Sequence, residues 1–193
     1  MASRFAKNTG MKSTKMSRLL AALALSSTLA TAAVAQSTPQ PVPIIDRVPE
    51  PEDRPLSAPM KLEGDATDVA RAIFRVKQSI PVEPGKPLIL LYPQWLPGKH
   101  GPRGALAEMA GLKIRSGGKL LNWTRDPVEV YAFHVDTPAG TRSVDVEFQF
   151  TSPVQGSEGR IVVTPAMMNI QWEQVALYPA GHFTRAIQVQ PSI

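Results

Sequence analysis

Residues 143–150 have the sequence Ser143-Val144-Asp145-Val146-Glu147-Phe148-Gln149-Phe150. Apolar and polar side chains alternate through the whole stretch, which is the period of a β-strand with one buried face. We therefore expect Val144, Val146, Phe148 and Phe150 to point into a core and the residues between them to face water.

Further short segments of this kind flank the stretch on both sides. Alternating or continuous apolar runs occur at residues 72–77, 87–92, 112–115, 120–124, 128–135, 160–163, 170–178 and 186–190. Turn-forming residues separate them at a spacing of about ten residues, and no long amphipathic helix competes with them. Seven to nine short strands spaced in this way predict an all-β fold, an antiparallel β-sandwich.

The first 35 residues have the three parts of a secretory signal peptide. These are a basic region (Lys12, Lys15, Arg18), an apolar stretch (19–33) and the cleavage motif Ala33-Val34-Ala35. The apolar stretch contains Ser and Thr and is shorter than the roughly 20 residues that span a bilayer, so an uncleaved anchor is the weaker alternative. Met11 and Met16 are ordinary starts, which makes residues 1–10 a candidate start-site extension. We expect an exported protein, periplasmic or secreted, without membrane attachment after cleavage.

The net charge of +5 comes from this leader. Residues 1–35 contain five of the 21 basic residues and no acidic residue, which leaves 16 of each sign in the remainder. A neutral folded part gives no support for a nucleic acid or a membrane surface as partner.

A proline-rich segment follows the leader. Residues 36–59 contain seven prolines, and such a composition predicts an extended, disordered linker. A ligand for a proline-binding module is the alternative function of this segment. We expect the folded domain to occupy residues 60–193.

The sequence contains no recognisable catalytic or metal-binding constellation. It has no cysteine, which excludes disulfides and thiolate ligands. The three histidines, His100, His134 and His182, lack the spacing of a helical zinc site, and no His-Glu-x-x-His occurs. Paired carboxylates for glycoside chemistry stay open, because spatial pairing is invisible in a sequence. We predict no catalytic residue, no metal and no cofactor.

The stretch Tyr92-Pro93-Gln94-Trp95-Leu96-Pro97-Gly98-Lys99-His100-Gly101-Pro102-Arg103-Gly104 is the candidate binding element. Its three prolines and three glycines exclude a helix interior and a central strand. A rigid loop with an aromatic residue at a strand end is either a structural corner or a recognition surface. The candidate residues for contact with a ligand or another domain are Trp95, Pro97, Gly98, His100 and Arg103.

The motif Pro93-Gln94-Trp95-Leu96-Pro97-Gly98 resembles the P-x-W-x-P-G signature in the N-terminal domain of M61-family metallopeptidases, the glycyl aminopeptidase family. Further features follow in the order of that domain: Ala110-Gly111-Leu112, Ser116-Gly117-Gly118, Trp123, the 131–135 strand, Pro165-Ala166-Met167-Met168-Asn169 and Tyr178-Pro179-Ala180-Gly181. The resemblance covers residues 66–193, essentially the whole folded part.

The resemblance implies a protein of several parts: an N-terminal β-domain, a zinc domain with His-Glu-x-x-His and often a PDZ domain. No position in this sequence matches the zinc ligands or the catalytic glutamate of the family. We therefore expect a non-catalytic β-domain, truncated at its C-terminal end, that supports or shapes substrate access to a catalytic domain. Its partners would be that metallopeptidase domain or a peptide substrate. The alternative is a free-standing periplasmic β-sandwich that binds a peptide or glycan through Trp95 and its loop.

Overall fold

The computed structural model describes residues 43–96, 98–153 and 162–193, so the predicted signal peptide lies outside the described residues. Residues Ile45–Ile193 form one compact unit. Within the described ranges the regular structure consists of strands and 3-10 turns of three or four residues. No helix in these ranges is long and apolar enough to cross a membrane. The predicted all-β fold is confirmed.

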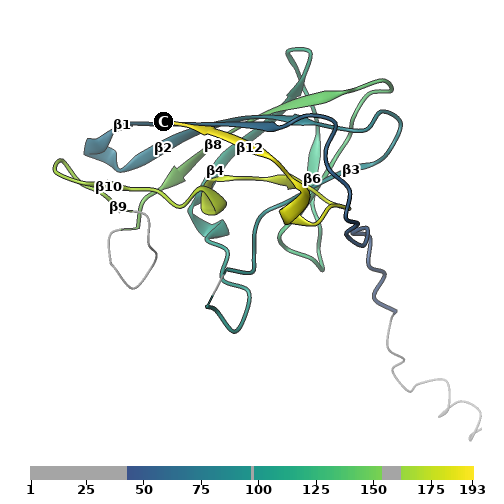
Figure 1. Cartoon of the computed structure of the whole chain (residues 1–193), viewed down its shortest axis with the longest axis horizontal. Coiled ribbons are helices and arrows are strands. Elements are labelled where there is room, and N and C mark those ends of the chain that lie inside the picture. The colour runs from purple at the N-terminus through teal and green to yellow at the C-terminus, as the bar shows by residue number, and fades with distance from the viewer. Residues whose placement is uncertain (1–42, 97, 154–161) are drawn as a thin grey trace, which may run out of the picture. The chain divides into compact units, whose positions relative to one another are not determined.

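The larger sheet has six strands in the order β12-β1-β2-β8-β4-β5 (Figure 1). Their bounds are β1 Met60–Asp68, β2 Ile73–Pro81, β4 Met109–Ser116, β5 Lys119–Leu120, β8 Ser143–Thr151 and β12 Val189–Ser192. The two central strands, β2 and β8, pair along their whole length in antiparallel register. Every neighbouring pair is antiparallel except β12 and β1, which run parallel.

The smaller sheet has four antiparallel strands in the order β11-β3-β7-β6. Their bounds are β3 Leu88–Leu91, β6 Trp123–Arg125, β7 Ala132–Val135 and β11 Tyr178–Pro179. A separate two-stranded ladder joins β9 Val162–Val163 to β10 Met168–Asn169. The 3-10 turns are η1 Val69–Arg71, η2 Leu106–Glu108, η3 Trp172–Val175 and η4 Thr184–Ala186.

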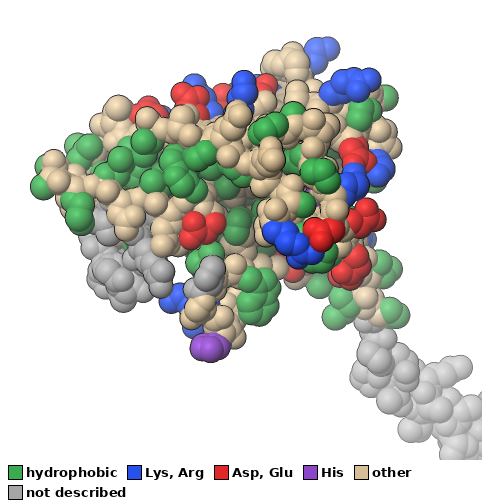
Figure 2. Space-filling view, in the orientation of Figure 1, with side chains coloured by type: hydrophobic (Ala, Val, Ile, Leu, Met, Phe, Trp, Pro, Cys, Tyr) green, Lys and Arg blue, Asp and Glu red, His purple; other side chains and the backbone are tan. Residues whose placement is uncertain are grey.

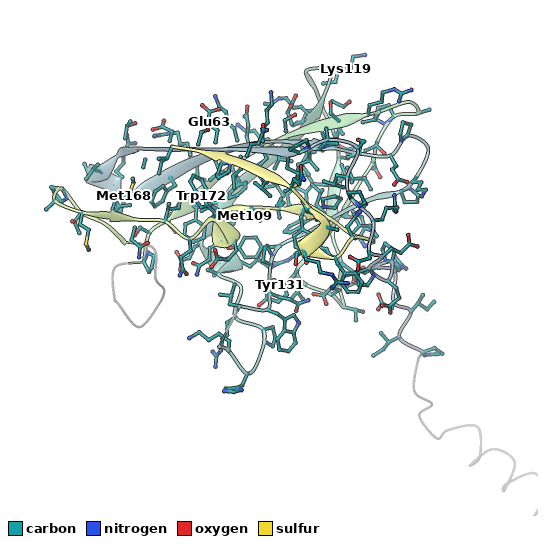
Figure 3. All side chains as sticks on the ribbon, viewed as in Figure 1. Glu63, Met109, Lys119, Tyr131, Met168 and Trp172 are labelled. Carbon is teal, nitrogen blue, oxygen red and sulfur yellow. The ribbon has the colours of Figure 1, made fainter. Side chains whose placement is uncertain are left out.

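A single hydrophobic core takes side chains from both sheets. Val144, Val146, Phe148 and Phe150 of β8 are all buried, as their alternation predicts. The positions between them, Asp145, Glu147 and Gln149, are polar and face outward, and charged side chains gather along this outer side (Figure 2). Glu63 and Lys119 project from the outer side of the larger sheet, whereas Met109 and Trp172 lie on its inner side (Figure 3).

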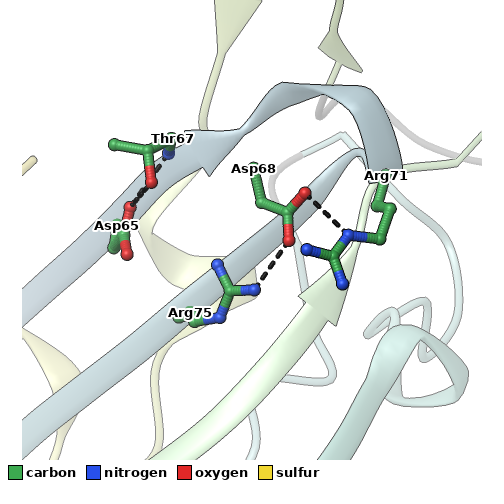
Figure 4. A network of polar contacts seen from close by, with 5 residues as sticks. All are labelled: Asp65, Thr67, Asp68, Arg71 and Arg75. Atoms are coloured by element: carbon green, nitrogen blue, oxygen red, sulfur yellow. Dashed lines mark hydrogen bonds and ion pairs between the residues drawn. The ribbon is translucent and has the colours of Figure 1, made fainter.

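A network of carboxylates and guanidinium groups fixes the corner between β1 and β2 (Figure 4). Asp68 accepts hydrogen bonds from Arg71 Nε at 3.0 Å and from Arg75 Nη2 at 2.6 Å. The corner ends at Ala72, whose φ of 52° lies in the left-handed region that non-glycine residues seldom adopt. These side-chain contacts hold a backbone conformation that the local sequence does not favour.

The predicted strand at 128–135 begins four residues later than expected, at Ala132. The reason is Asp126, whose Oδ1 accepts the N–H groups of Val128 at 2.8 Å and Glu129 at 2.9 Å. An aspartate that binds backbone groups two and three residues ahead turns the chain and competes with a strand. The alternation at residues 128–131 therefore belongs to a loop.

The predicted strand at 120–124 is divided between the two sheets. Leu120 ends β5 in the larger sheet, while Trp123 begins β6 and pairs with Val135 in the smaller one. Leu121 lies at the crossing, is buried, and its N–H donates to Ile114 O.

Two further strand predictions need correction. Residues 170–178 contain the 3-10 turn η3, and only Tyr178 at the end of this range lies in a strand. The adjacent residues Gln174 and Val175 are both buried, so burial in this segment does not alternate as it does in a strand with one exposed face. The strand predicted at 186–190 begins later, at Val189 of β12, because the 3-10 turn η4 ends at Ala186. The alternation in β1 was not recognised, although Met60 and Leu62 alternate with charged residues and are buried.

The parallel strand β12 forms an edge of the larger sheet. Gln188 O accepts the N–H of Met60 at 2.9 Å, so Gln190 also directs its main-chain groups toward β1. Val189 and Pro191 therefore direct their main-chain groups away from β1, to the unpaired edge of the sheet. Because Pro191 has no N–H, this edge offers one donor fewer to another chain.

Part of the predicted linker pairs with the C-terminal region of the domain. The N–H of Glu52 donates to Gly181 O at 3.2 Å, and Glu52 O accepts the N–H of Phe183 at 3.1 Å. Asp53 forms two hydrogen bonds with Arg185, at 3.1 and 2.7 Å. The domain boundary at residue 60 stays a prediction, as does disorder in residues 36–42, which lie outside the described residues.

Candidate functional site

The candidate loop starts from a residue fixed deep in the core. Tyr92 is 1% exposed, its hydroxyl donates to Gln174 O at 2.5 Å, and its N–H donates to Tyr131 O at 2.9 Å. Burial raises the pKa of the Tyr92 hydroxyl, since an ionised phenolate would lose its hydration there. The proline-rich loop therefore leaves the end of β3 from a rigid base.

The loop is closed at its base by close backbone contact. Arg103 N–H donates to Gln94 O at 2.7 Å, which joins the two arms. Gly104 lies so close to Pro93 that a Cβ atom at this position would overlap Pro93 O and come within 2.9 Å of the Tyr131 ring. Glycine is thus required at residue 104, because no other residue allows this approach.

The predicted site residues lie toward the outer part of this loop. Trp95 is 64% exposed. His100 and Arg103 are also exposed, and Gly98 is exposed with a φ of 78°. Pro97 lies outside the described residues. The Trp95 ring therefore lies largely outside the core, and a role in ligand contact stays a prediction.

A second loop adds apolar surface that sequence analysis missed. Val128 is 57% exposed and Val130 is 46% exposed, both in the loop that precedes β7. The side chain of Gln94 donates to Glu129 Oε2 at 3.2 Å, so the two loops are joined at the residue next to Trp95. The pair Asp126-Pro127 was the available sequence signal that Val128 and Val130 belong to a turn. We call the exposed residues Trp95, Val128 and Val130 the end patch.

The charged surroundings of the end patch are basic on the side of the Trp95 loop, whereas the acidic residue Glu129 lies between Val128 and Val130. Lys99, His100 and Arg103 are exposed on the loop, and no acidic residue occurs between positions 93 and 107. Exposed tryptophan and arginine are the residue types that contribute most to protein interfaces. The arrangement can contact an apolar surface that carries acidic groups opposite the Trp95 loop.

No group of three or more His, Asp or Glu residues in the described ranges is placed to hold a metal ion. Asp126 and His134 form a hydrogen-bonded pair, with 2.8 Å between Oδ2 and Nε2. The contact with His134, and then the N–H groups of Val128 and Glu129, lower the pKa of Asp126 to about 2. Because Asp126 also accepts the N–H groups that form the 128–129 turn, we interpret the Asp126–His134 pair as a structural contact that links this turn to strand β7.

Comparison with known protein families identifies the domain. The profile of the Peptidase M61 N-terminal domain matches residues 61–192. The chain belongs to this family, which confirms the resemblance drawn from the P-x-W-x-P-G motif and the features that follow it.

A solved structure shares the fold. It is the crystal structure of an aminopeptidase N family protein from Idiomarina loihiensis, with a TM-score of 0.53 and 17% sequence identity. The similarity covers 62% of this chain and 19% of the other, so the chain corresponds to about a fifth of that protein. At this identity the likeness concerns the fold alone. A search of curated protein sequences gives no significant match.

Proposed function

We propose that this chain acts as a non-catalytic β-domain of an exported M61-type zinc aminopeptidase, and that it supports or shapes substrate access to the catalytic domain. The observation that carries the proposal is the family match over residues 61–192 together with the absence of His-Glu-x-x-His from the 193 residues. The end patch is the surface on which the catalytic domain would dock. Its apolar residues and the basic side chains of the Trp95 loop suit an apolar partner surface that carries acidic groups opposite this loop.

The genomic sequence that follows the codon for Ile193 is the first test. A continuing or adjacent frame with His-Glu-x-x-His would support the proposal, whereas an unrelated frame would contradict it. The encoded zinc domain, expressed separately, should then bind the chain in sedimentation or calorimetric titrations.

Substitutions in the end patch test the docking surface. Trp95→Ala should weaken binding of the zinc domain by about tenfold or more, as expected for a central aromatic contact. Leu120→Ala is the matched control, because Leu120 is 65% exposed on the other sheet. Equal affinities of both variants and the unchanged chain would exclude the end patch as the docking site.

The proposal also predicts that the chain alone does not hydrolyse peptides. Purified chain should hold no stoichiometric zinc and should not release N-terminal glycine or alanine from peptides. Chelator-sensitive release of either residue would contradict it, because a metal-activated water would then be present.

The exposure of Trp95 supports one other candidate function. A free-standing module could use the exposed ring to stack on a peptide or a glycan. In that case Trp95 fluorescence should change on titration with the ligand in the absence of any zinc domain. Ligand binding that calorimetry still detects in Trp95→Phe at reduced affinity, together with no binding of the zinc domain, would favour this alternative.

A further inference from the structure

A cavity of about 530 Å³ lies at the other end of strand β3 from the candidate loop. Three segments that are distant in sequence form it: residues 47–57, residues 81–89 and residues 179–182, with Thr137 beside them. Its volume lies within the range of about 300–1,000 Å³ that is typical of small-molecule sites. Neither the end patch nor the proposed docking takes part in it.

Hydrogen bonds and an ion pair hold residues 47–57, which form one wall of the cavity, against the rest of the domain. The backbone of Glu52 pairs with residues 181–183, and Arg54 forms an ion pair with Glu83. His182 is 7% exposed, and its Nδ1 lies 2.7 Å from Arg54 O. Since a carbonyl oxygen accepts, Nδ1 carries the proton, and in the neutral ring Nε2 is left as an acceptor. The cavity is therefore formed before any ligand arrives.

The surface of the cavity combines apolar walls with balanced charge. Apolar side chains and prolines line much of it, including Pro49, Leu56, Val82 and Pro179. Its lining has three basic residues, Arg47, Arg54 and Lys86, and three acidic ones, Glu50, Glu52 and Glu83. A ligand with a large net charge of either sign would meet repulsion as well as attraction.

Two of these charges stay available to a ligand. Glu83 pairs with both Arg54 and Lys86, and Glu52 pairs with Arg54. Arg47 and Glu50 are exposed at the cavity, and neither takes part in an ion pair within the described residues. A molecule with one positive and one negative end and an apolar middle would complement this arrangement.

We propose that this cavity binds short zwitterionic peptides with apolar side chains. Glu50 would face the free amino group, Arg47 the free carboxylate, and the proline-rich wall the side chains. His182 Nε2 would accept a hydrogen bond from a peptide N–H. The site does not depend on a docked catalytic domain.

Calorimetric titration of the full chain with the tripeptide Ala-Pro-Leu tests the proposal. We expect a dissociation constant between about 1 μM and 1 mM. Acetylation of the amino end or amidation of the carboxyl end should weaken binding by about tenfold. No detectable binding of Ala-Pro-Leu at millimolar concentration, or equal binding of the doubly capped peptide, would overturn the proposal.

Substitutions at three positions test where the peptide binds. Ser57→Trp places a large ring at an exposed position on the cavity wall and should abolish binding, whereas Ser192→Trp on the exposed strand β12 should not. Glu50→Gln should weaken binding of the free peptide but leave that of the N-acetylated peptide unchanged. Thermal midpoints of the variants establish that each is folded, and unchanged binding by folded Ser57→Trp would place the ligand elsewhere.

Discussion

The side chain of Gln78 and the backbone of Leu177 form a reciprocal amide pair inside the core. Gln78 Nε2 donates to Leu177 O at 3.0 Å, and Leu177 N–H donates to Gln78 Oε1 at 2.8 Å. Both residues are buried, and they join the centre of the larger sheet to the segment that leads into β11. Gln78 thereby supplies the hydrogen bonds that Leu177 would otherwise make in a sheet. The buried glutamine explains how an irregular segment can cross the core.

Replacement of Gln78 by leucine should lower the free energy of unfolding by about 2–4 kcal/mol. The variant leaves the N–H and C=O of Leu177 buried without partners, and each such group costs about 1–3 kcal/mol. Urea unfolding followed by circular dichroism measures the change. Gln149→Leu is the matched control on the exposed face of β8, and its effect should stay within about 0.5 kcal/mol. Equal effects of the two substitutions would contradict the assigned role of Gln78.

Tyr92 should make the domain sensitive to alkali. Because burial raises the folded-state pKa of Tyr92, the unfolded chain loses its proton first, and stability falls as the pH rises above about 10. The slope that one such group contributes is at most about 1.4 kcal/mol per pH unit. Tyr92→Phe should be less stable at neutral pH by about 1 kcal/mol, because the bond to Gln174 O is lost.

The same variant tests the assignment of the alkaline transition. Urea unfolding of both proteins between pH 8 and pH 11.5 should give a shallower decrease for Tyr92→Phe. The pKa of Tyr178 is also raised by burial, so part of the slope should remain in the variant. A slope identical to that of the unchanged chain would show that Tyr92 is not the titrating group.

The larger sheet could be predicted from sequence more fully than the smaller one. In β8 the alternation of side chains coincides with one buried face, so pattern and structure agree. The smaller sheet is covered differently, since Leu88, Ile89 and Leu90 are all buried and give no alternation. In the smaller sheet the strand ends depend on side-chain contacts, such as those of Asp126 with the backbone of Val128 and Glu129. The spacing of apolar residues along the sequence does not reveal such contacts.

The two proposed binding surfaces, the Trp95 loop and the cavity beside His182, also differ in how far they could be predicted from sequence. Sequence identified the loop around Trp95, because prolines and glycines concentrated within thirteen residues constrain the backbone. It did not identify the cavity beside His182, whose wall comes from three segments separated by tens of residues. An isolated parallel bridge, outside the strands of both sheets, brings residues 52 and 182 together. A single sequence contains no local signal for such a contact.

Asp126 should contribute an acid-dependent part of the stability. Its pKa is lowered from 3.8 to about 2 in the folded chain, chiefly by the hydrogen bond to His134. The unfolded chain therefore takes up the proton first, so the contribution is present above about pH 3.8 and is lost as the pH falls toward 2. Asp126→Asn should flatten the acid part of the stability profile, measured by urea unfolding between pH 2 and pH 6. The exposed residue Asp136 provides the control, and Asp136→Asn should keep the original profile.

The close approach of Gly104 to Pro93 predicts opposite outcomes for two glycines in one loop. In Gly104→Ala the new methyl group would overlap Pro93 O and press on the Tyr131 ring, so the two arms must separate. We expect a loss of about 1–3 kcal/mol in the free energy of unfolding, the usual cost of overpacking. Movement of the arms should also displace Trp95 and weaken any partner that the end patch binds.

Gly101→Ala is the matched control three residues earlier. A Cβ atom at residue 101 would meet nothing within 4 Å, and this glycine is not among those with positive φ. Alanine there should change stability by no more than about 0.5 kcal/mol, or raise it slightly by restricting the unfolded chain. Thermal unfolding followed by tryptophan fluorescence records stability and the surroundings of the indole rings together. If Gly104→Ala proved as stable as Gly101→Ala, with unchanged fluorescence, the loop would be a pliable connection, and a fixed placement of Trp95 could no longer be maintained.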